Sequence, residues 1–168
     1  AGFGVKNIGL TSKTSYLKLT PKNYFIGHQS GDSITTGAFN SFMGYQSGKN
    51  NTIGSDNSFV GFQSGFLNKT GNFNSFFGYQ TGYNNLTGSN NIYLGYQSGF
   101  NNNGDNNSFL GFKSGYSNIS GSSNTFLGSE SGYSNTAGNY NAFIGWKSGW
   151  SNSTGDDNVA LGYFSGYS

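Results

Sequence analysis

The chain has no cysteine, a single histidine and few charged residues, and these shortages exclude several classes of protein. Without cysteine there is no disulfide framework. With one histidine and no cysteine, a single chain cannot assemble a transition-metal cluster. Charged residues make up only 8% of the 168 positions, which is too few for a disordered polyelectrolyte. No apolar run approaches the roughly 20 residues of a membrane-spanning helix.

The few acidic and basic residues do not form a recognisable site. The acids are Asp32, Asp56, Asp105, Glu130, Asp156 and Asp157, and they do not recur at one position of a repeat, as calcium-binding β-helices require. The serines have no base beside them, and His28 occupies a position that is otherwise aromatic. The repeats lack arginine, which argues against nucleic-acid binding. We therefore expect no enzyme, no cofactor and no metal.

Glycine and aromatic residues are abundant instead, and they recur with a period of 17 residues. The motif F-h-G-aromatic-Q-S-G, in which h is apolar, occurs nine times in recognisable form. Its leading glycines are Gly27, Gly44, Gly61, Gly78, Gly95, Gly111, Gly128, Gly145 and Gly162, and only the interval from Gly95 to Gly111 is 16 residues. Because a repeat this short cannot bury a core alone, the copies must stack on one another.

Two further columns accompany the glycine in every copy. Asparagine stands four residues before it, at Asn23, Asn40, Asn57, Asn74, Asn91, Asn107, Asn124, Asn141 and Asn158. An aromatic residue stands two before it, at Phe25, Phe42, Phe59, Phe76, Tyr93, Phe109, Phe126 and Phe143, with Ala160 in the last copy. Stacking places identical residues above one another, so these columns predict an amide ladder and an aromatic stack.

The segment around the leading glycine has the composition of a strand. It is short, aromatic and β-branched, with Gly and Asn on both sides, and no window has a helical period. We predict an all-β fold, a parallel β-solenoid or β-roll of about nine 17-residue coils over residues 23–168, stacked at roughly 4.8 Å. The missing residue falls between Gly99 and Gly104, inside a turn, so replacing Asn102 should matter far less than replacing Gly95.

Residues 1–22 lack the repeat and form a separate segment. It holds half of the lysines, namely Lys6, Lys13, Lys18 and Lys22, whereas the repeats are neutral to slightly acidic. The ends of a solenoid need covering, which predicts a cap on the first coil. The alternative is a docking arm that covers the open last coil of a neighbour and extends the rod end to end into a filament.

Alternation along the strand predicts that both of its faces are partly apolar. It places Phe42 and Gln46 on one face and Met43, Tyr45 and Ser47 on the other. A thin coil encloses one face only, so the other would form an apolar stripe that copies of the chain bury against one another. The candidate interface aromatics are Tyr45, Phe62, Tyr79, Tyr96, Phe112 and Trp146, and, in a second column, Tyr83, Phe100, Tyr116, Tyr133 and Trp150. The alternative is that these rings simply face solvent.

The unit from Asn57 to Gly65, Asn-Ser-Phe-Val-Gly-Phe-Gln-Ser-Gly, resembles the head repeats of trimeric autotransporter adhesins. It is also similar to head-like repeats of large bacterial surface proteins and of phage tail fibres. The resemblance covers residues 23–168, although the 17-residue coil is longer than the usual head unit. It implies a left-handed parallel β-roll, a homotrimer, a cell-surface location and adhesion.

These observations favour a non-enzymatic, extracellular structural protein. The leading hypothesis is a self-associating fibre or adhesin segment of a microbial surface appendage, with copies of itself as partners and no membrane span in this chain. Aromatic rows that bind surface glycans are an alternative. Ice binding is a weaker alternative, since the column Thr36, Thr70, Thr87 and Thr154 is interrupted.

Five N-glycosylation motifs begin at asparagines in the turns, where a glycan would be accessible. They are Asn50, Asn68, Asn85, Asn118 and Asn152. Because Asn and Thr are common turn residues, a repeated turn also creates such motifs by chance.

Overall fold

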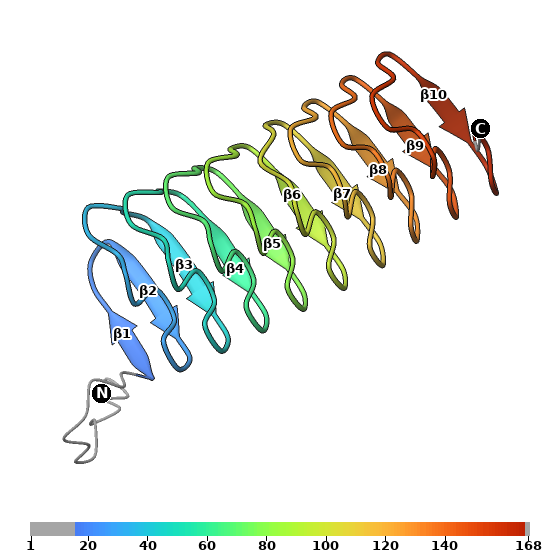
Figure 1. Ribbon diagram of the computed structural model, residues 1–168. Helices are drawn as coiled ribbons and strands as arrows, with labels where there is room; N and C mark the ends of the chain where they lie inside the picture. The colour runs from blue at the N-terminus through green and yellow to red at the C-terminus, as the bar shows by residue number, and fades with distance from the viewer. Residues whose placement is uncertain (1–15, 167–168) are drawn as a thin grey trace.

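The computed structural model describes residues 16–166, in which all regular secondary structure is β-strand. Ten strands form one sheet and follow one another in chain order, as Figure 1 shows. The strands are β1 (Leu17–Leu19), β2 (Asn23–Ile26), β3 (Asn40–Met43), β4 (Ser58–Val60), β5 (Ser75–Phe77), β6 (Ile92–Leu94), β7 (Ser108–Leu110), β8 (Thr125–Leu127), β9 (Ala142–Ile144) and β10 (Val159–Leu161).

Strands β2 to β10 are parallel, and each pairs with the strand one repeat away. Phe42 of β3, for example, lies beside Phe59 of β4. The predicted parallel β-solenoid is therefore confirmed, with one strand from each of the nine repeats. The handedness of the coil remains a prediction.

The core is a single stack of aromatic rings that runs the length of the rod. Its members are Phe25, Phe42, Phe59, Phe76, Tyr93, Phe109, Phe126 and Phe143, all at most 2% exposed, and Ala160 closes the series. Successive ring centroids lie between 4.6 and 5.1 Å apart. The second glycine of each repeat passes close to a ring: at Gly48 a Cβ atom would lie 2.4 Å from the Phe42 ring. Glycine lets the turn close over the core without a clash.

The asparagine column forms a buried hydrogen-bonded ladder beside the ring stack. The backbone N–H and the side-chain amide of Asn57 both donate to Oδ1 of Asn40, at 3.0 and 3.2 Å. The same amide donates to the carbonyl of Gly71 at 2.8 Å. Each rung thus fixes the position of the next coil while satisfying its own buried polar atoms.

A second asparagine ladder lies in the turns and was not recognised in the sequence. Its members are Asn51, Asn68, Asn85, Asn102, Asn118, Asn135 and Asn152. The amide of Asn68 donates to Oδ1 of Asn51 at 2.8 Å and to the carbonyl of Gly71 at 3.1 Å. In the first coil this position holds Ile34, which packs against the core. The available signal was an asparagine three residues before a further glycine that follows the motif in most repeats, as at Asn51 and Gly54.

This ladder corrects the expectation of accessibility for three of the five glycosylation motifs. The acceptors Asn68, Asn85 and Asn118 are fully buried, whereas Asn50 and Asn152 are half-buried. The turn folds back over the interior, so the amide that a glycan would need is used inside the coil.

The shortened coil keeps its strand register. Tyr93 of β6 pairs with Phe109 of β7, so the lost residue is absorbed in the turn as predicted. The surroundings of Asn102 argue against the expectation that its replacement matters little, and that effect stays a prediction. Asn102 is fully buried, because the shorter turn still directs its side chain into the second asparagine ladder.

Part of the N-terminal segment covers the first coil of its own chain. Strand β1 pairs antiparallel with β2, with Leu17 opposite Ile26, and the Gly27 N–H donates to the Tyr16 carbonyl at 2.8 Å. Residues 1–15, which include Lys6 and Lys13, lie outside the described residues. A docking role for them remains a prediction. Strand β10 forms the opposite edge of the sheet (Figure 1).

Candidate binding surface

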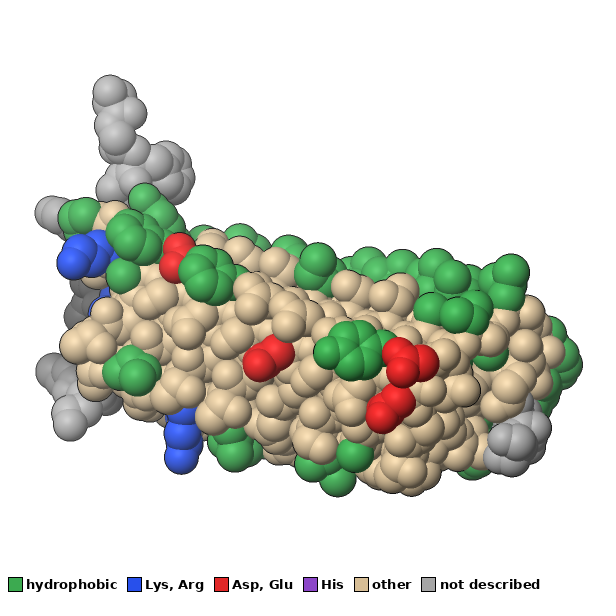
Figure 2. Space-filling view, turned by 90° about the horizontal axis from the view of Figure 1, so that it is seen from above, with side chains coloured by type: hydrophobic (Ala, Val, Ile, Leu, Met, Phe, Trp, Pro, Cys, Tyr) green, Lys and Arg blue, Asp and Glu red, His purple; other side chains and the backbone are tan. Residues whose placement is uncertain are grey.

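The outward residue at the end of each strand belongs to a continuous apolar row. This row consists of Ile26, Met43, Val60, Phe77, Leu94, Leu110, Leu127, Ile144 and Leu161. Val60 is half-buried, and the others are between 37% and 72% exposed. In Figure 2, hydrophobic side chains line one long edge of the rod, while the face toward the viewer is mostly polar with isolated hydrophobic side chains. The rod therefore carries its exposed apolar surface in an ordered array.

A shallow apolar depression lies where this row crosses β6 to β8. Its volume is about 220 Å³. It is lined by Ile92, Ser108, Phe109, Leu110, Thr125, Phe126 and Leu127. Two side-chain hydroxyls are the polar side-chain groups of this lining, so the depression suits an apolar partner and has no catalytic pair.

The predicted alternation holds within the strand and fails beyond it. Phe42 points into the core and Met43 points out, as expected. Ser47 was expected outside but is fully buried, because β3 ends at Met43. After that point Gly44 has φ 136° and Gln46 has φ 55°, which turn the chain out of the strand conformation. Ser47 instead donates to the carbonyl of Phe59 at 3.0 Å.

The residue directly after the leading glycine of each repeat belongs to a second exposed array, which we call the outer aromatic ladder. It contains His28, Tyr45, Phe62, Tyr79, Tyr96, Phe112, Trp146 and Tyr163, and is interrupted by Ser129. From His28 to Phe112, neighbouring ring centroids are 5.0 to 5.5 Å apart. Since neighbouring rings cover the ring faces, the ladder presents mainly ring edges and tyrosine hydroxyls to solvent.

The other predicted aromatic column is stacked but less exposed. It runs through Phe66, Tyr83, Phe100, Tyr116, Tyr133 and Trp150, with centroids 4.9 to 5.7 Å apart. These residues are half-buried, so they contribute to packing between coils as well as to the surface.

A polar column lies next to the outer aromatic ladder. In the first five coils it consists of glutamines, whose side chains donate to one another at 2.7 to 2.9 Å, as from Gln46 to Gln29. In the following coils the column changes to Lys113, Glu130 and Lys147. Lys147 Nζ and Glu130 Oε2 are 3.4 Å apart.

His28 lies between two aromatic rings. It begins the outer aromatic ladder, with its ring centroid 5.4 Å from Tyr16 and 5.5 Å from Tyr45. Between residues 16 and 166, no three side chains of the metal-binding types come together. The described acids therefore do not gather around this histidine.

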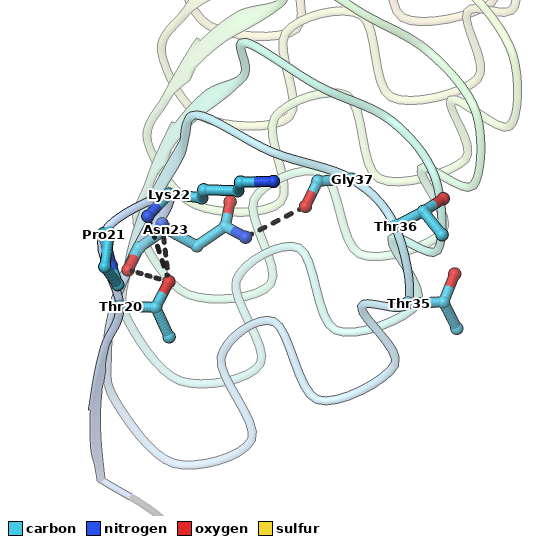
Figure 3. Close-up of a pocket in the computed structure, with 7 residues that line it drawn as sticks. All are labelled: Thr20, Pro21, Lys22, Asn23, Thr35, Thr36 and Gly37. Atoms are coloured by element: carbon cyan, nitrogen blue, oxygen red, sulfur yellow. Dashed lines mark hydrogen bonds between the residues drawn. The ribbon is translucent and has the colours of Figure 1, made fainter.

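A cavity lies at the N-terminal end of the rod (Figure 3). Its volume is about 480 Å³, and it is lined by Thr20, Pro21, Lys22, Asn23, Thr35, Thr36 and Gly37. Oγ1 of Thr20 accepts the Asn23 N–H at 2.8 Å, and the Asn23 amide donates to the Gly37 carbonyl at 2.9 Å. These bonds hold the first coil closed. Lys22 is the charged side chain among the residues that line the cavity.

No helix in the described part of the chain is long and apolar enough to cross a lipid bilayer. Comparison with known proteins gives no match to a family model, to a curated protein or to a solved structure. The candidate surface is therefore interpreted from its own geometry.

Proposed function

We propose that this chain is a non-enzymatic structural rod of an extracellular microbial appendage and that it associates with copies of itself. The observation that carries this proposal is the continuous apolar row from Ile26 to Leu161. With nine coils spaced at roughly 4.8 Å, the row is about 40 Å long. Monomeric proteins rarely leave a contiguous apolar patch of such extent in water.

Burial of the row would stabilise an assembly in proportion to the apolar area removed from water, at roughly 25 cal/mol per Å². A straight, regularly spaced row fits a second straight row, so another copy of the chain is a suitable partner. A closed trimer and an open filament both meet this requirement. The buried asparagine ladders suit a structural role, because they stiffen the rod along its axis.

Glycan binding through the aromatic rows is a second proposal with a narrower basis. Along the intact parts of the outer aromatic ladder, neighbouring rings occupy the faces that a sugar would need. Glycan contacts there would use ring edges and hydroxyl groups. The fold adds no support for ice binding, because Ile53 and Ala137 interrupt the threonine column.

The native mass of the particle tests self-association. Sedimentation velocity over a range of concentrations should give a mass several times the 17.9 kDa of one chain, and electron microscopy should show trimers or filaments. Changing Leu110 and Leu127 together to glutamine should return the chain to monomers, since it places two amides in the row at the apolar depression. Antibodies to the rod should label intact cells of its source.

The control changes Phe39 and Phe73 to glutamine. These rings are 64% and 60% exposed but lie outside the apolar row, so their removal should leave assembly unchanged. A wild-type chain that stays monomeric at all concentrations would refute self-association. Equal effects of both pairs of changes would show that assembly is not directed by the row.

A further inference from the structure

The outer aromatic ladder lacks one ring in its seventh coil. Ser129 occupies that position, between Phe112 in the coil before and Trp146 in the coil after. Among the described residues, Phe112 stacks on Tyr96, and Trp146 stacks on Tyr163 at 4.9 Å and meets the Phe164 ring edge-on at 4.7 Å. One face of Phe112 and one face of Trp146 therefore lack a stacked ring.

The size of this gap follows from the coil spacing. Two coil steps separate Phe112 from Trp146, which is about 10 Å along the axis. One ring placed midway would lie about 5 Å from each neighbour, the distance at which the other rings of this ladder stack. The gap thus has the thickness of one six-membered ring.

The polar column changes its chemistry at the same place. Lys113, Glu130 and Lys147 replace the glutamines that run from Gln29 to Gln97. Glu130 is paired with Lys147, whose ammonium group lies 4.7 Å from the Trp146 ring centroid. The Lys113 ammonium lies 5.5 Å from the Phe112 centroid and has no carboxylate partner in the described part of the chain.

We propose that the gap at Ser129 binds one pyranose ring that carries a carboxylate, as in a uronic acid. The apolar C–H faces of a pyranose would pack against the two ring faces, while its hydroxyls would meet the Ser129 hydroxyl and the Glu130 carboxylate. Lys113 would pair with the sugar carboxylate. An aromatic ring would also fill the gap, but it would leave these polar groups without a role. The site uses the outer aromatic ladder and does not depend on self-association through the apolar row.

Titration of the whole chain with three small probes tests this site. The probes are sodium glucuronate, glucose and sodium phenylacetate, followed by saturation-transfer NMR and by tryptophan fluorescence. Glucuronate should bind saturably and several-fold more tightly than glucose, and phenylacetate should bind weakly. No saturable binding of either sugar would overturn the proposal. Tighter binding of phenylacetate would show that the gap accepts an aromatic ring instead.

Variants at Ser129 and Lys113 test the stacking gap and the positive charge separately. Ser129→Phe completes the ladder and should abolish binding, whereas Ser129→Ala keeps the gap and should retain most of it. Lys113→Gln restores the residue type of the earlier coils and should remove the preference for glucuronate over glucose. Circular dichroism establishes that each variant is folded. If Ser129→Phe does not fold, the preference of Lys113→Gln for glucuronate over glucose still tests the proposal. Unchanged binding in folded Ser129→Phe, or unchanged selectivity in Lys113→Gln, would overturn the site.

Discussion

The hydroxyl of Tyr93 accepts a hydrogen bond from the side-chain amide of Asn102, inside the coil that is one residue short. In the preceding coils the corresponding amide donates to the asparagine before it, as from Asn85 to Asn68. Here the donor has turned to tyrosine, and Oδ1 of Asn85 is left without a hydrogen-bond partner in the described structure. Tyr93 is the one tyrosine in the core stack, so its hydroxyl and the shortened turn form a matched pair.

A double-mutant cycle should show that the tyrosine at position 93 and the shortened turn compensate each other. Tyr93→Phe alone should destabilise the fold by about 1 kcal/mol, because a buried hydrogen bond is lost. Insertion of a threonine after Asn103 alone should also destabilise it, since a turn of normal length meets the Tyr93 hydroxyl. Urea denaturation of the combined variant should show a loss smaller than the sum of the two. Additive losses would mean that the tyrosine and the short turn are unrelated.

Asn102→Ala should destabilise the chain by about 2 kcal/mol or more. Oδ1 of Asn102 accepts from the amides of Asn107 and Asn118, so truncation leaves several buried groups unsatisfied. The matched control is Asn106→Gly, an exposed position with φ 58° that glycine adopts readily. Thermal melting should show a large decrease for the first variant and little change for the second. Equal melting temperatures for the two variants would show that the second asparagine ladder does not contribute to stability.

Gly95→Val should disrupt the middle of the rod. A Cβ atom there would lie 2.5 Å from the carbonyl oxygen of Gly111, and the residue has φ 135°. Gly162 has a similar φ of 118° but no atom within 4 Å of its Cβ position. Gly162→Val should therefore cost only the backbone strain of about 1–3 kcal/mol, and Gly95→Val clearly more. Comparable melting temperatures for the two variants would show that the close approach between coils is unimportant.

Alkaline pH should destabilise the chain through Tyr93. Burial raises the pKa of Tyr93 well above the ordinary value of 10.0; hydrogen bonds from Asn107 and Asn102 lower it, and the charge of Asp105 raises it. Above pH 10 the unfolded chain releases the tyrosine proton while the folded chain retains it, so stability falls as pH rises. The fall attributable to Tyr93 should approach about 1.4 kcal/mol per pH unit. Urea titrations between pH 9 and 11.5 should show this excess slope in the wild type and not in Tyr93→Phe.

The period of 17 residues was sufficient to predict the stacked coils, the parallel strands and the inward column from Phe25 to Phe143. Repetition made this possible, because a residue type that is required in every coil appears nine times in the sequence. The second asparagine ladder was harder to predict, since Asn51 and Asn68 lie in turns where asparagine is common for local reasons. Their burial depends on how the turn folds over the core, which the composition of a turn does not specify.

The sequence by itself determined that this chain is a rod, because identical repeats too short to fold alone can satisfy their polar and apolar groups only by stacking. The tertiary structure decided which side of the rod each turn residue faces. The positive φ angles at Gly44 and Gln46 reverse the chain after the strand, so Ser47 enters the interior while Tyr45 stays outside. The register of 17 residues already placed Phe112, Ser129 and Trp146 in one column of the sequence. Only the folded coil shows that this column lies on the outside of the rod, because its exposure depends on the direction in which the chain turns after each strand.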